Sequence, residues 1–343
     1  MELPALLNSE PELERLLAAP YREEIEAARS WDGDLLFLGA GGKMGPTMAM
    51  RARAAMDAAG SPHAVIAVSR YSDAGARARL NEAGVRTISC DLLEPGALDR
   101  LPDAPNVFYL AARKFGTGAQ AALTWATNSF LPGLVARRYA SSRIVSFSTG
   151  NVYPFTPPGA PPDESVPPNP VGEYGMSTLG RERIFEHFSH ENGTRVTMLR
   201  LNYAVEMRYG VLVDLAQKVA GGVPIDLSMG RVNIIWEGDA HAVTLRSLAH
   251  AAAPPFILNL TGTETWAVRD LAAELGRRLG REPVFTGSEA PLALLSDASL
   301  CARMFGPPKV SIPQVLDWIA AWLASGGALW SKPTHFQVRD GKF

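Results

Sequence analysis

The sequence predicts an α/β fold, in which a doubly wound parallel sheet carries a smaller, interwoven C-terminal lobe. Three observations predict it: short apolar runs that suit buried strands, helical patterns that alternate with them, and a glycine-rich turn after the first run. Strands that alternate with helices give a parallel sheet with helices on both faces. Ligands of such sheets bind at the carboxyl ends of the strands.

The alternation runs in order through the first part of the chain. Apolar runs predict strands at 35–38, 65–69, 85–90, 107–112, 143–148 and 195–201. Helical patterns separate them at about 45–59, 73–83, 118–139 and 174–190. Function is therefore expected where the first five strands end, at Gly39, Arg70, Asp91, Ala112 and Thr149.

The glycine turn joins the first strand to its helix. Gly39 permits the tight turn, Gly42 lets the backbone approach a pyrophosphate, and Gly45 lets helix and strand pack closely. The helix N-terminus attracts negative charge. The pattern predicts a Rossmann-type dinucleotide site, with Lys43 and Met44 inside the turn. A purely structural glycine turn is the alternative.

The second strand ends in Ser69-Arg70, where sites that prefer NAD usually carry an acid for the ribose 2′-hydroxyl. An arginine can pair with a 2′-phosphate or stack on adenine. Arg70 therefore favours NADP(H) over NAD(H) as the cofactor. The alternative is a solvated arginine at the end of a strand.

The domain boundaries follow from these elements. We expect a helical extension at 1–30 and the dinucleotide-binding Rossmann domain at 31–205, to which elements of about 230–262 return. The substrate-binding lobe takes up most of 206–330, with further helices near 210–220, 239–252, 267–280, 296–305 and 313–325 and strands near 233–236, 256–260 and 283–286. The proline-rich loop 154–172 is expected to be a functional flap. The tail 331–343 is expected to dock on the body or on a neighbouring subunit.

Composition excludes several classes of partner. The 343 residues carry a net charge of −2, so no basic excess indicates nucleic acid or a membrane surface. The chain has no signal-peptide pattern and no long apolar stretch, which favours a cytoplasmic protein. Its two cysteines and six histidines show no metal-ligand spacing, so we expect no metal. A small-molecule substrate is the remaining expectation.

The spacing of these motifs over residues 33–285 resembles the extended short-chain dehydrogenase/reductase superfamily, of the nucleotide-sugar epimerase/dehydratase type. The markers are the glycine turn, Asp91-Leu92, Leu110-Ala111-Ala112, Asn128, the run Ser148–Tyr153, and Tyr174-Gly175-Met176-Ser177. The resemblance implies Thr149 and Tyr174 as catalytic residues. It also implies cofactor contacts at Asp91, Leu92, Leu110, Ala111, Ala112, Lys114, Asn128, Tyr174, Leu201 and Tyr203.

One departure from the family pattern matters. The family's Tyr-x-x-x-Lys motif reads Tyr174-Gly175-Met176-Ser177-Thr178 here, so Thr178 takes the place of the lysine beside Tyr174. The lysine's charge normally lowers the pKa of the tyrosine, and a threonine cannot do this. Our hypothesis is that Lys114 supplies the missing charge. Arg181, on the same helix face, and Lys43 are the other candidates.

Further side chains fall near the expected cleft and suit a hydroxylated or anionic substrate, although each could be an ordinary packing or surface residue. They are Arg113, Asn151, Asn202, Arg208, Asn233 and Trp236. The first functional hypothesis is an NAD(P)-dependent oxidoreductase or epimerase acting on a sugar-like or polyhydroxylated small molecule. The others are a dinucleotide sensor without turnover and an atypical lyase or isomerase. The resemblance also implies a homodimer.

Overall fold

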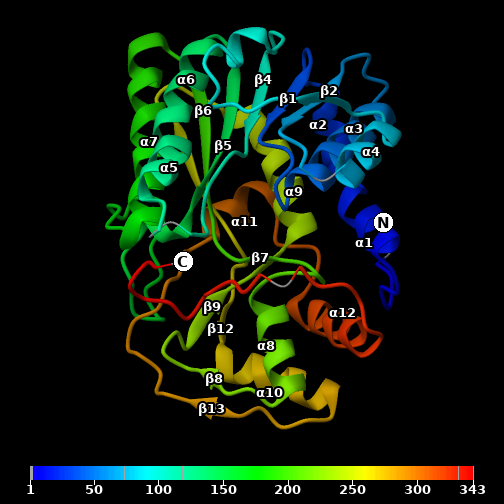
Figure 1. The fold of residues 1–343 in the computed structure, drawn as a ribbon, viewed down its shortest axis with the longest axis vertical. Helices are drawn as coiled ribbons and strands as arrows, with labels where there is room; N and C mark the ends of the chain where they lie inside the picture. Colours follow the sequence, from blue (N-terminus) through cyan, green and yellow to red (C-terminus); the bar gives the residue numbers. More distant parts are fainter. Residues whose placement is uncertain (1–2, 73, 117–118, 331, 343) are drawn as a thin grey trace.

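A computed structural model describes residues 3–72, 74–116, 119–330 and 332–342 of the chain (Figure 1). Its centre is a seven-stranded sheet in the order β11-β6-β5-β4-β1-β2-β3, and every pair of neighbours is parallel. The strands are β1 Leu35–Leu38, β2 Val65–Ser69, β3 Arg86–Ser89, β4 Asn106–Tyr109, β5 Arg143–Thr149, β6 Arg195–Leu201 and β11 Phe256–Leu260. The predicted doubly wound α/β fold is confirmed.

Helices cover both faces of this sheet. Along β1, Leu35 and Phe37 belong to the core under α3 (Gly45–Ala58) and α9 (Glu237–Arg246). Leu36 and Leu38 belong to the core under α6 (Leu131–Arg138) and α7 (Gly172–Asn192). Successive side chains of a strand point to opposite faces, so a strand that is buried on both faces is apolar at every position. The remaining helices of the sheet domain are α4 Ala74–Glu82, η1 Leu98–Arg100, η3 Gly150–Val152, η4 Ser247–His250 and α11 Ser299–Phe305.

The long helix expected at 118–139 is interrupted, and its expected start lies outside the described residues. It consists of α5 (Ala121–Trp125), a π-helical turn η2 (Ala126–Phe130) and α6. Pro132 has no N–H group, so it cannot close an α-helical hydrogen bond to the carbonyl of Asn128. Such π-helical turns are frequent at functional sites.

The smaller lobe lies below the sheet in Figure 1. It contains α8 (Val211–Gly221), α10 (Val268–Leu279) and α12 (Ile312–Ala324) around a core with Trp236 and Trp318. Three short strand pairs complete it: β7 Ala204–Val205 with β10 Ile235–Trp236, β9 Arg231–Asn233 with β12 Thr265–Ala267, and β8 Ile225–Asp226 with β13 Phe285–Thr286.

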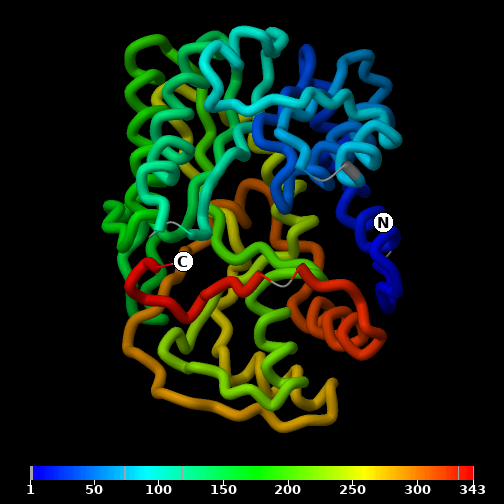
Figure 2. Tube along the Cα trace, viewed as in Figure 1, coloured from blue at the N-terminus to red at the C-terminus, as the bar shows by residue number. Residues whose placement is uncertain are grey.

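Both ends of the chain join the two parts. At the N-terminus, α1 (Glu10–Ala18) places Leu13 and Leu17 in the core of the smaller lobe. Helix α2 (Arg22–Ala28) reaches the sheet domain through the buried ion pair of Glu24 with Arg51 on α3. Near the C-terminus, the red segment in Figures 1 and 2 runs from α12 across the molecule, between the sheet and the smaller lobe, towards α7. Among the described residues, no helix is both long and apolar enough to cross a membrane.

Candidate active site

A cleft of about 350 Å³ lies at the carboxyl ends of β1, β2, β3 and β4. Nine of the residues expected to bind the cofactor or substrate line it: Gly39, Gly42, Arg70, Asp91, Leu92, Leu110, Ala111, Ala112 and Arg113. The sequence analysis missed others, among them Ser69, Tyr71, Cys90, Leu123 and Thr127. Tyr71 follows the end of β2, so the rule that ligands bind at the carboxyl ends of the strands could have predicted it. Leu123 and Thr127 come from the interrupted helix, whose rotation the sequence does not reveal.

The three expected glycines of the turn differ in what they contact. Gly39 has a φ of +87°, and a Cβ atom there would lie 2.6 Å from the backbone nitrogen of Ala111. A Cβ atom at Gly45 would lie within 2.7 Å of the backbone of Ala40. Both glycines are therefore required by the protein's own packing. A Cβ atom at Gly42 would meet only the Gly39 carbonyl, at 3.7 Å, so Gly42 leaves room on the side of the cleft.

Lys43 and Met44 belong to the glycine turn, but their side chains do not line this cleft. The Lys43 ammonium lies 3.0 Å from the buried Glu237 carboxylate, 3.3 Å from the Ala204 carbonyl and 4.2 Å from the centre of the Tyr209 ring. Met44 packs, partly buried, against the core under α3. The charge of Lys43 is thus already paired with a carboxylate.

The far end of the cleft carries two exposed polar side chains. Arg70 is exposed at the end of β2, and Asp91 is exposed after β3. The Asp91 carboxylate accepts a hydrogen bond from the backbone N–H of Leu93 at 3.0 Å, which shapes the turn around the buried Leu92. Among the described residues that directly follow β2, namely Arg70, Tyr71 and Ser72, there is no acid.

Asn128 holds the segment after β4. Its side-chain oxygen accepts the Arg113 N–H at 2.8 Å, and its Nδ2 donates to the Arg113 carbonyl at 2.9 Å and to the Ser177 hydroxyl at 3.0 Å. The residue is fully buried. Asn128 therefore links the wall of the cleft, at Arg113, to α7, at Ser177.

Thr149 and Tyr174 meet where β5 ends and α7 begins. The Thr149 hydroxyl oxygen accepts hydrogen bonds from the backbone N–H and the side-chain amide of Asn151, at 3.2 and 3.1 Å. Its own proton is then available for the hydrogen bond that it shares with the Tyr174 hydroxyl. Burial raises the pKa of Tyr174, while the Thr149 hydrogen bond and the charge of Arg181 oppose this rise.

Thr178 faces its own helix. Its hydroxyl donates to the Tyr174 carbonyl at 2.8 Å, and its side chain is 1% exposed. Serine and threonine commonly make this bond to a carbonyl one turn back. The hydroxyl that replaces the family lysine is therefore committed to the backbone.

Lys114 lies beside Tyr174, with its ammonium 5.9 Å from the centre of the tyrosine ring. Burial and the neighbouring Lys43 charge lower the pKa of Lys114 to about 8, against the opposing effect of the Asp214 carboxylate. The ammonium is thus near enough to influence the site, and it loses its charge in mildly alkaline solution.

The other expected substrate residues divide into two groups. Asn151 and the buried Asn202 lie at the ends of β5 and β6, and the Asn202 side chain is the nearest neighbour of Gly150. Arg208, Asn233 and Trp236 make internal contacts: Arg208 with Glu206, Glu10 and Glu14, Asn233 with Glu264 and Thr265, and Trp236 with Trp318. As substrate contacts, all of these remain predictions.

Two expected cofactor residues lie after the end of β6. Leu201, its last residue, is partly buried, and Tyr203 has a φ of +42° and packs against the core of the smaller lobe. Burial raises the pKa of Tyr203, so its phenol stays neutral at physiological pH. This side chain can donate a hydrogen bond but is a poor base.

The C-terminal segment contacts α8 and the start of α7. Thr334 donates its backbone N–H and its hydroxyl to Asp214, and Phe336 is 3% exposed. Gly341 lies against Gly172, two residues before Tyr174, and a Cβ atom on either glycine would come within 2.6 Å of the other's Cα atom. This segment docks on the body of the chain.

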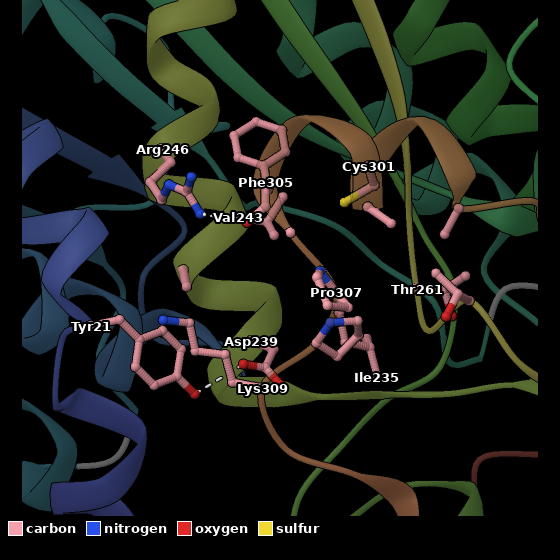
Figure 3. A pocket seen from close by; sticks show the side chains of 16 residues that line it. Tyr21, Ile235, Asp239, Val243, Arg246, Thr261, Cys301, Phe305, Pro307 and Lys309 are labelled. Carbon is pink, nitrogen blue, oxygen red and sulfur yellow. Dashed lines mark hydrogen bonds between the residues drawn. The ribbon is translucent and has the colours of Figure 1, made fainter. Parts of the chain in front are cut away.

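A second cavity, between α2, α9 and α11, is too small for a cofactor (Figure 3). It holds about 30 Å³, which is the share of one water molecule in the liquid. The Tyr21 hydroxyl donates to Asp239 in its wall, and Lys309 pairs with Glu23 nearby. Among the described residues, no group of three or more His, Cys, Asp or Glu side chains is arranged to hold a metal ion.

A glycine turn, a cleft along the carboxyl ends of the strands and a Thr–Tyr pair define a dinucleotide-dependent enzyme class. Residues 35–205 match the model of the NAD dependent epimerase/dehydratase family. Residues 35–205 of the chain thus belong to this family. No match was found among curated proteins.

Solved structures share the fold. A UDP-glucose 4-epimerase from Thermotoga maritima is 18% identical, with 85% of this chain and 99% of that chain covered and a TM-score of 0.69. A UDP-glucuronic acid 4-epimerase from Bacillus cereus in complex with NAD is 17% identical, with 87% and 100% covered and a TM-score of 0.72. A dTDP-glucose 4,6-dehydratase from Streptomyces venezuelae, with NAD bound, is 20% identical, with 85% and 97% covered and a TM-score of 0.72.

Proposed function

We propose that the chain is an NAD(P)-dependent oxidoreductase or epimerase that acts on a sugar-like or other polyhydroxylated small molecule. The observation that carries the proposal is the hydrogen bond between Thr149 and Tyr174 at the edge of the sheet where the cofactor cleft lies. The dinucleotide, held in the cleft, would supply the hydride chemistry, and Tyr174 in its phenolate form would accept the hydroxyl proton of a substrate that is oxidised. Thr149 and Tyr174 polarise the substrate oxygen in either direction.

Lys114 is the nearest candidate for a cofactor contact on the catalytic side. Its ammonium faces the Tyr174 ring, and it follows the cleft residues Ala111 and Ala112. In the proposal it contacts the nicotinamide ribose. Lys114→Ala is then expected to reduce both turnover and cofactor affinity, as measured by steady-state kinetics and by fluorescence titration. Wild-type values for both would refute this role.

For the cofactor itself we propose NADP(H) rather than NAD(H), on the strength of Arg70. Two of the three solved structures named above hold NAD, so Arg70 is the feature that would set this chain apart. We assign to the dinucleotide the nine expected residues that line the cleft. Around them we place Lys43, Met44, Gly45, Asn128, Leu201 and Tyr203.

We also propose a homodimer through the face of α5, η2 and α7. Trp125, Phe130 and Met176 are 38%, 60% and 46% exposed there, which is unusual for large apolar side chains. Analytical ultracentrifugation of the wild type and of Phe130→Glu tests the pairing. A monomeric wild type would refute it.

A second candidate function is a dinucleotide sensor without turnover. Two observations favour it: the Thr178 hydroxyl is bonded to a backbone carbonyl, and the C-terminal segment docks against the start of α7, two residues before Tyr174. The two functions differ in one measurement. An enzyme changes the redox state of bound or added dinucleotide when it is offered sugars, polyols and nucleotide sugars, and Tyr174→Phe abolishes the change. If no substrate in such a panel alters the absorbance of the reduced nicotinamide or yields an epimer by chromatography, the enzyme proposal fails.

A further inference from the structure

Arg181 occupies an unusual place for a charged side chain. It lies seven residues after Tyr174 on α7, and only 2% of its surface is exposed. Its guanidinium donates to the carbonyls of Phe147 at 2.6 Å, Ala111 at 3.0 Å and Asn128 at 3.3 Å, and to the Asn128 side chain at 3.2 Å. All four acceptors are neutral. Among the described residues, no carboxylate pairs with Arg181 in an ion pair.

A buried charge without a counter-ion is costly, so its surroundings must compensate it. Here the compensation comes from backbone carbonyls at the end of β4, within β5 and in the π-helical turn. Pro132 leaves the Asn128 carbonyl without its α-helical donor, and Arg181 donates to that carbonyl instead. Because these acceptors are dipoles and not charges, the positive field of Arg181 is not cancelled nearby.

The geometry directs this field at Tyr174. Side chains of a helix lean towards its N-terminus, and residues seven apart lie on one face, so Arg181 extends back towards the turn that carries Tyr174. Both side chains then reach the same strand: Arg181 bonds to Phe147 and Tyr174 bonds to Thr149. Phe147 and Thr149 are two residues apart on β5, which corresponds to about 7 Å along the strand. A buried charge still acts strongly over such a distance.

We infer that Arg181 supplies the positive charge that the lysine of the family motif would supply, and that it is a positioning residue for Tyr174. Arg181 acts from its buried position through its electrostatic field at the phenol oxygen of Tyr174, and it does not touch substrate. The inference rests on Tyr174 being the acid–base group of the proposed function. It revises the hypothesis that Lys114 provides this charge.

The other charged groups around Tyr174 are less suited to the role. Lys114 has a pKa of about 8 because it is buried, so it is largely neutral at the alkaline pH where a tyrosine ionises. Lys43 is paired with Glu237, and Asp214, from α8, is negative. Tyr209, which also feels the charge of Tyr174, has a pKa raised by burial and stays neutral. An arginine keeps its charge throughout this range.

The test measures the ionisation of Tyr174 in the full-length protein and needs no substrate. The ultraviolet absorbance of tyrosinate is titrated, and the curve of Tyr174→Phe is subtracted from it, while circular dichroism defines the pH range in which the protein is folded. Arg181→Met is expected to raise the midpoint for Tyr174 by about one pH unit or more. Adding Thr178→Arg to Arg181→Met is expected to return the midpoint towards the wild-type value, because a guanidinium, which keeps its charge in alkaline solution, is restored one turn from the tyrosine. A residue with a purely structural role would not give this rescue.

Arg181→Lys keeps the inference testable if the methionine variant does not fold. Its ammonium is charged at neutral pH, where it can support folding, and buried lysines lose their charge below the usual range. In the alkaline titration this variant should therefore also shift Tyr174 upwards. An unchanged midpoint in either folded Arg181 variant overturns the inference. If the midpoints shift as expected but no substrate is ever turned over, the proposed function fails and the electrostatic role of Arg181 stands.

Discussion

The two sides of the candidate site are built differently. The dinucleotide side presents exposed groups. Arg70 and Asp91 are exposed in the cleft, and a Cβ atom at Gly42 would not collide with the rest of the protein. The catalytic and substrate side is dense with internal bonds. Thr178 is bonded to its own helix, Lys43 to Glu237, and Asp214 to the C-terminal segment.

This difference separates what is shared with relatives from what belongs to this chain. A dinucleotide is held largely by backbone geometry, so a strand, a glycine turn and a helix suffice to form its cleft. The substrate side depends on side chains that come from distant parts of the sequence. Thr178, at the position where the family motif has lysine, and the buried Arg181 lie on that side.

The largest effect is expected on the catalytic side. Tyr174→Phe should reduce turnover by about 10²–10⁴-fold, because it removes the acid–base hydroxyl, and should weaken dinucleotide binding far less, because the aromatic ring is kept. Steady-state kinetics and fluorescence titration give the two values. Tyr139→Phe is the matched control, since Tyr139, at the C-cap of α6, donates its hydroxyl to the Pro102 carbonyl, away from this pair. Equal turnover in the two variants would remove Tyr174 from the chemistry.

The glycine turn offers a matched pair on the dinucleotide side. Gly39→Ala should destabilise the fold by about 2–4 kcal/mol, because it places a Cβ atom at positive φ and 2.6 Å from the Ala111 backbone. Gly42→Ala should change the free energy of unfolding by less than about 0.5 kcal/mol. It should nevertheless weaken dinucleotide binding about tenfold, because its methyl group takes space on the side of the cleft.

Urea unfolding and dinucleotide titration separate these two roles. If Gly42→Ala binds dinucleotide as tightly as the wild type, the pyrophosphate does not approach the turn at this residue. If Gly39→Ala is as stable as the wild type, the turn relaxes more easily than its contact with Ala111 indicates.

The sequence predicts the sheet well because β1 is apolar at every position and most of its other strands contain a short apolar run. The bounds of β1, β2, β6 and β11 agree with the predicted runs. The interruption of the 118–139 helix was not predicted, although Pro132 is visible in the sequence. A proline in the interior of a helix removes a backbone hydrogen bond and kinks or breaks the helix. Here the Arg181 guanidinium gives the freed Asn128 carbonyl a partner.

Within the site, local motifs were predictable and long-range pairings were not. The glycine turn and the strand ends that line the cleft follow from neighbours in the sequence. The Lys43–Glu237 pair joins residues from opposite halves of the chain, and the four acceptors of Arg181 come from three elements. Such contacts depend on the packed structure, which periodicity alone does not determine.

A smaller effect is expected from pH, through Lys114. Its pKa is lowered to about 8 in the folded protein, mainly by burial, whereas an unfolded lysine titrates near about 10.4. Between these values the unfolded chain binds more protons, so the free energy of unfolding contributed by this group rises with pH. Lys114→Met should remove about 1–3 kcal/mol of that rise, and the exposed Lys332→Met should not. Equal pH slopes for wild type and Lys114→Met in urea unfolding would contradict the burial of this charge.

The smallest effect concerns cofactor choice. Arg70→Ala should weaken NADP binding about tenfold, because it removes a charge-assisted hydrogen bond to the 2′-phosphate, and should leave NAD binding unchanged. Arg86→Ala is the control, since Arg86 is exposed at the opposite end of the neighbouring strand and changes the net charge equally. Calorimetric titration of both dinucleotides against each variant gives the four affinities. Equal losses for NADP and NAD would mean that Arg70 stacks on the adenine, and the dinucleotide side would then resemble its NAD-binding relatives as closely as its fold does.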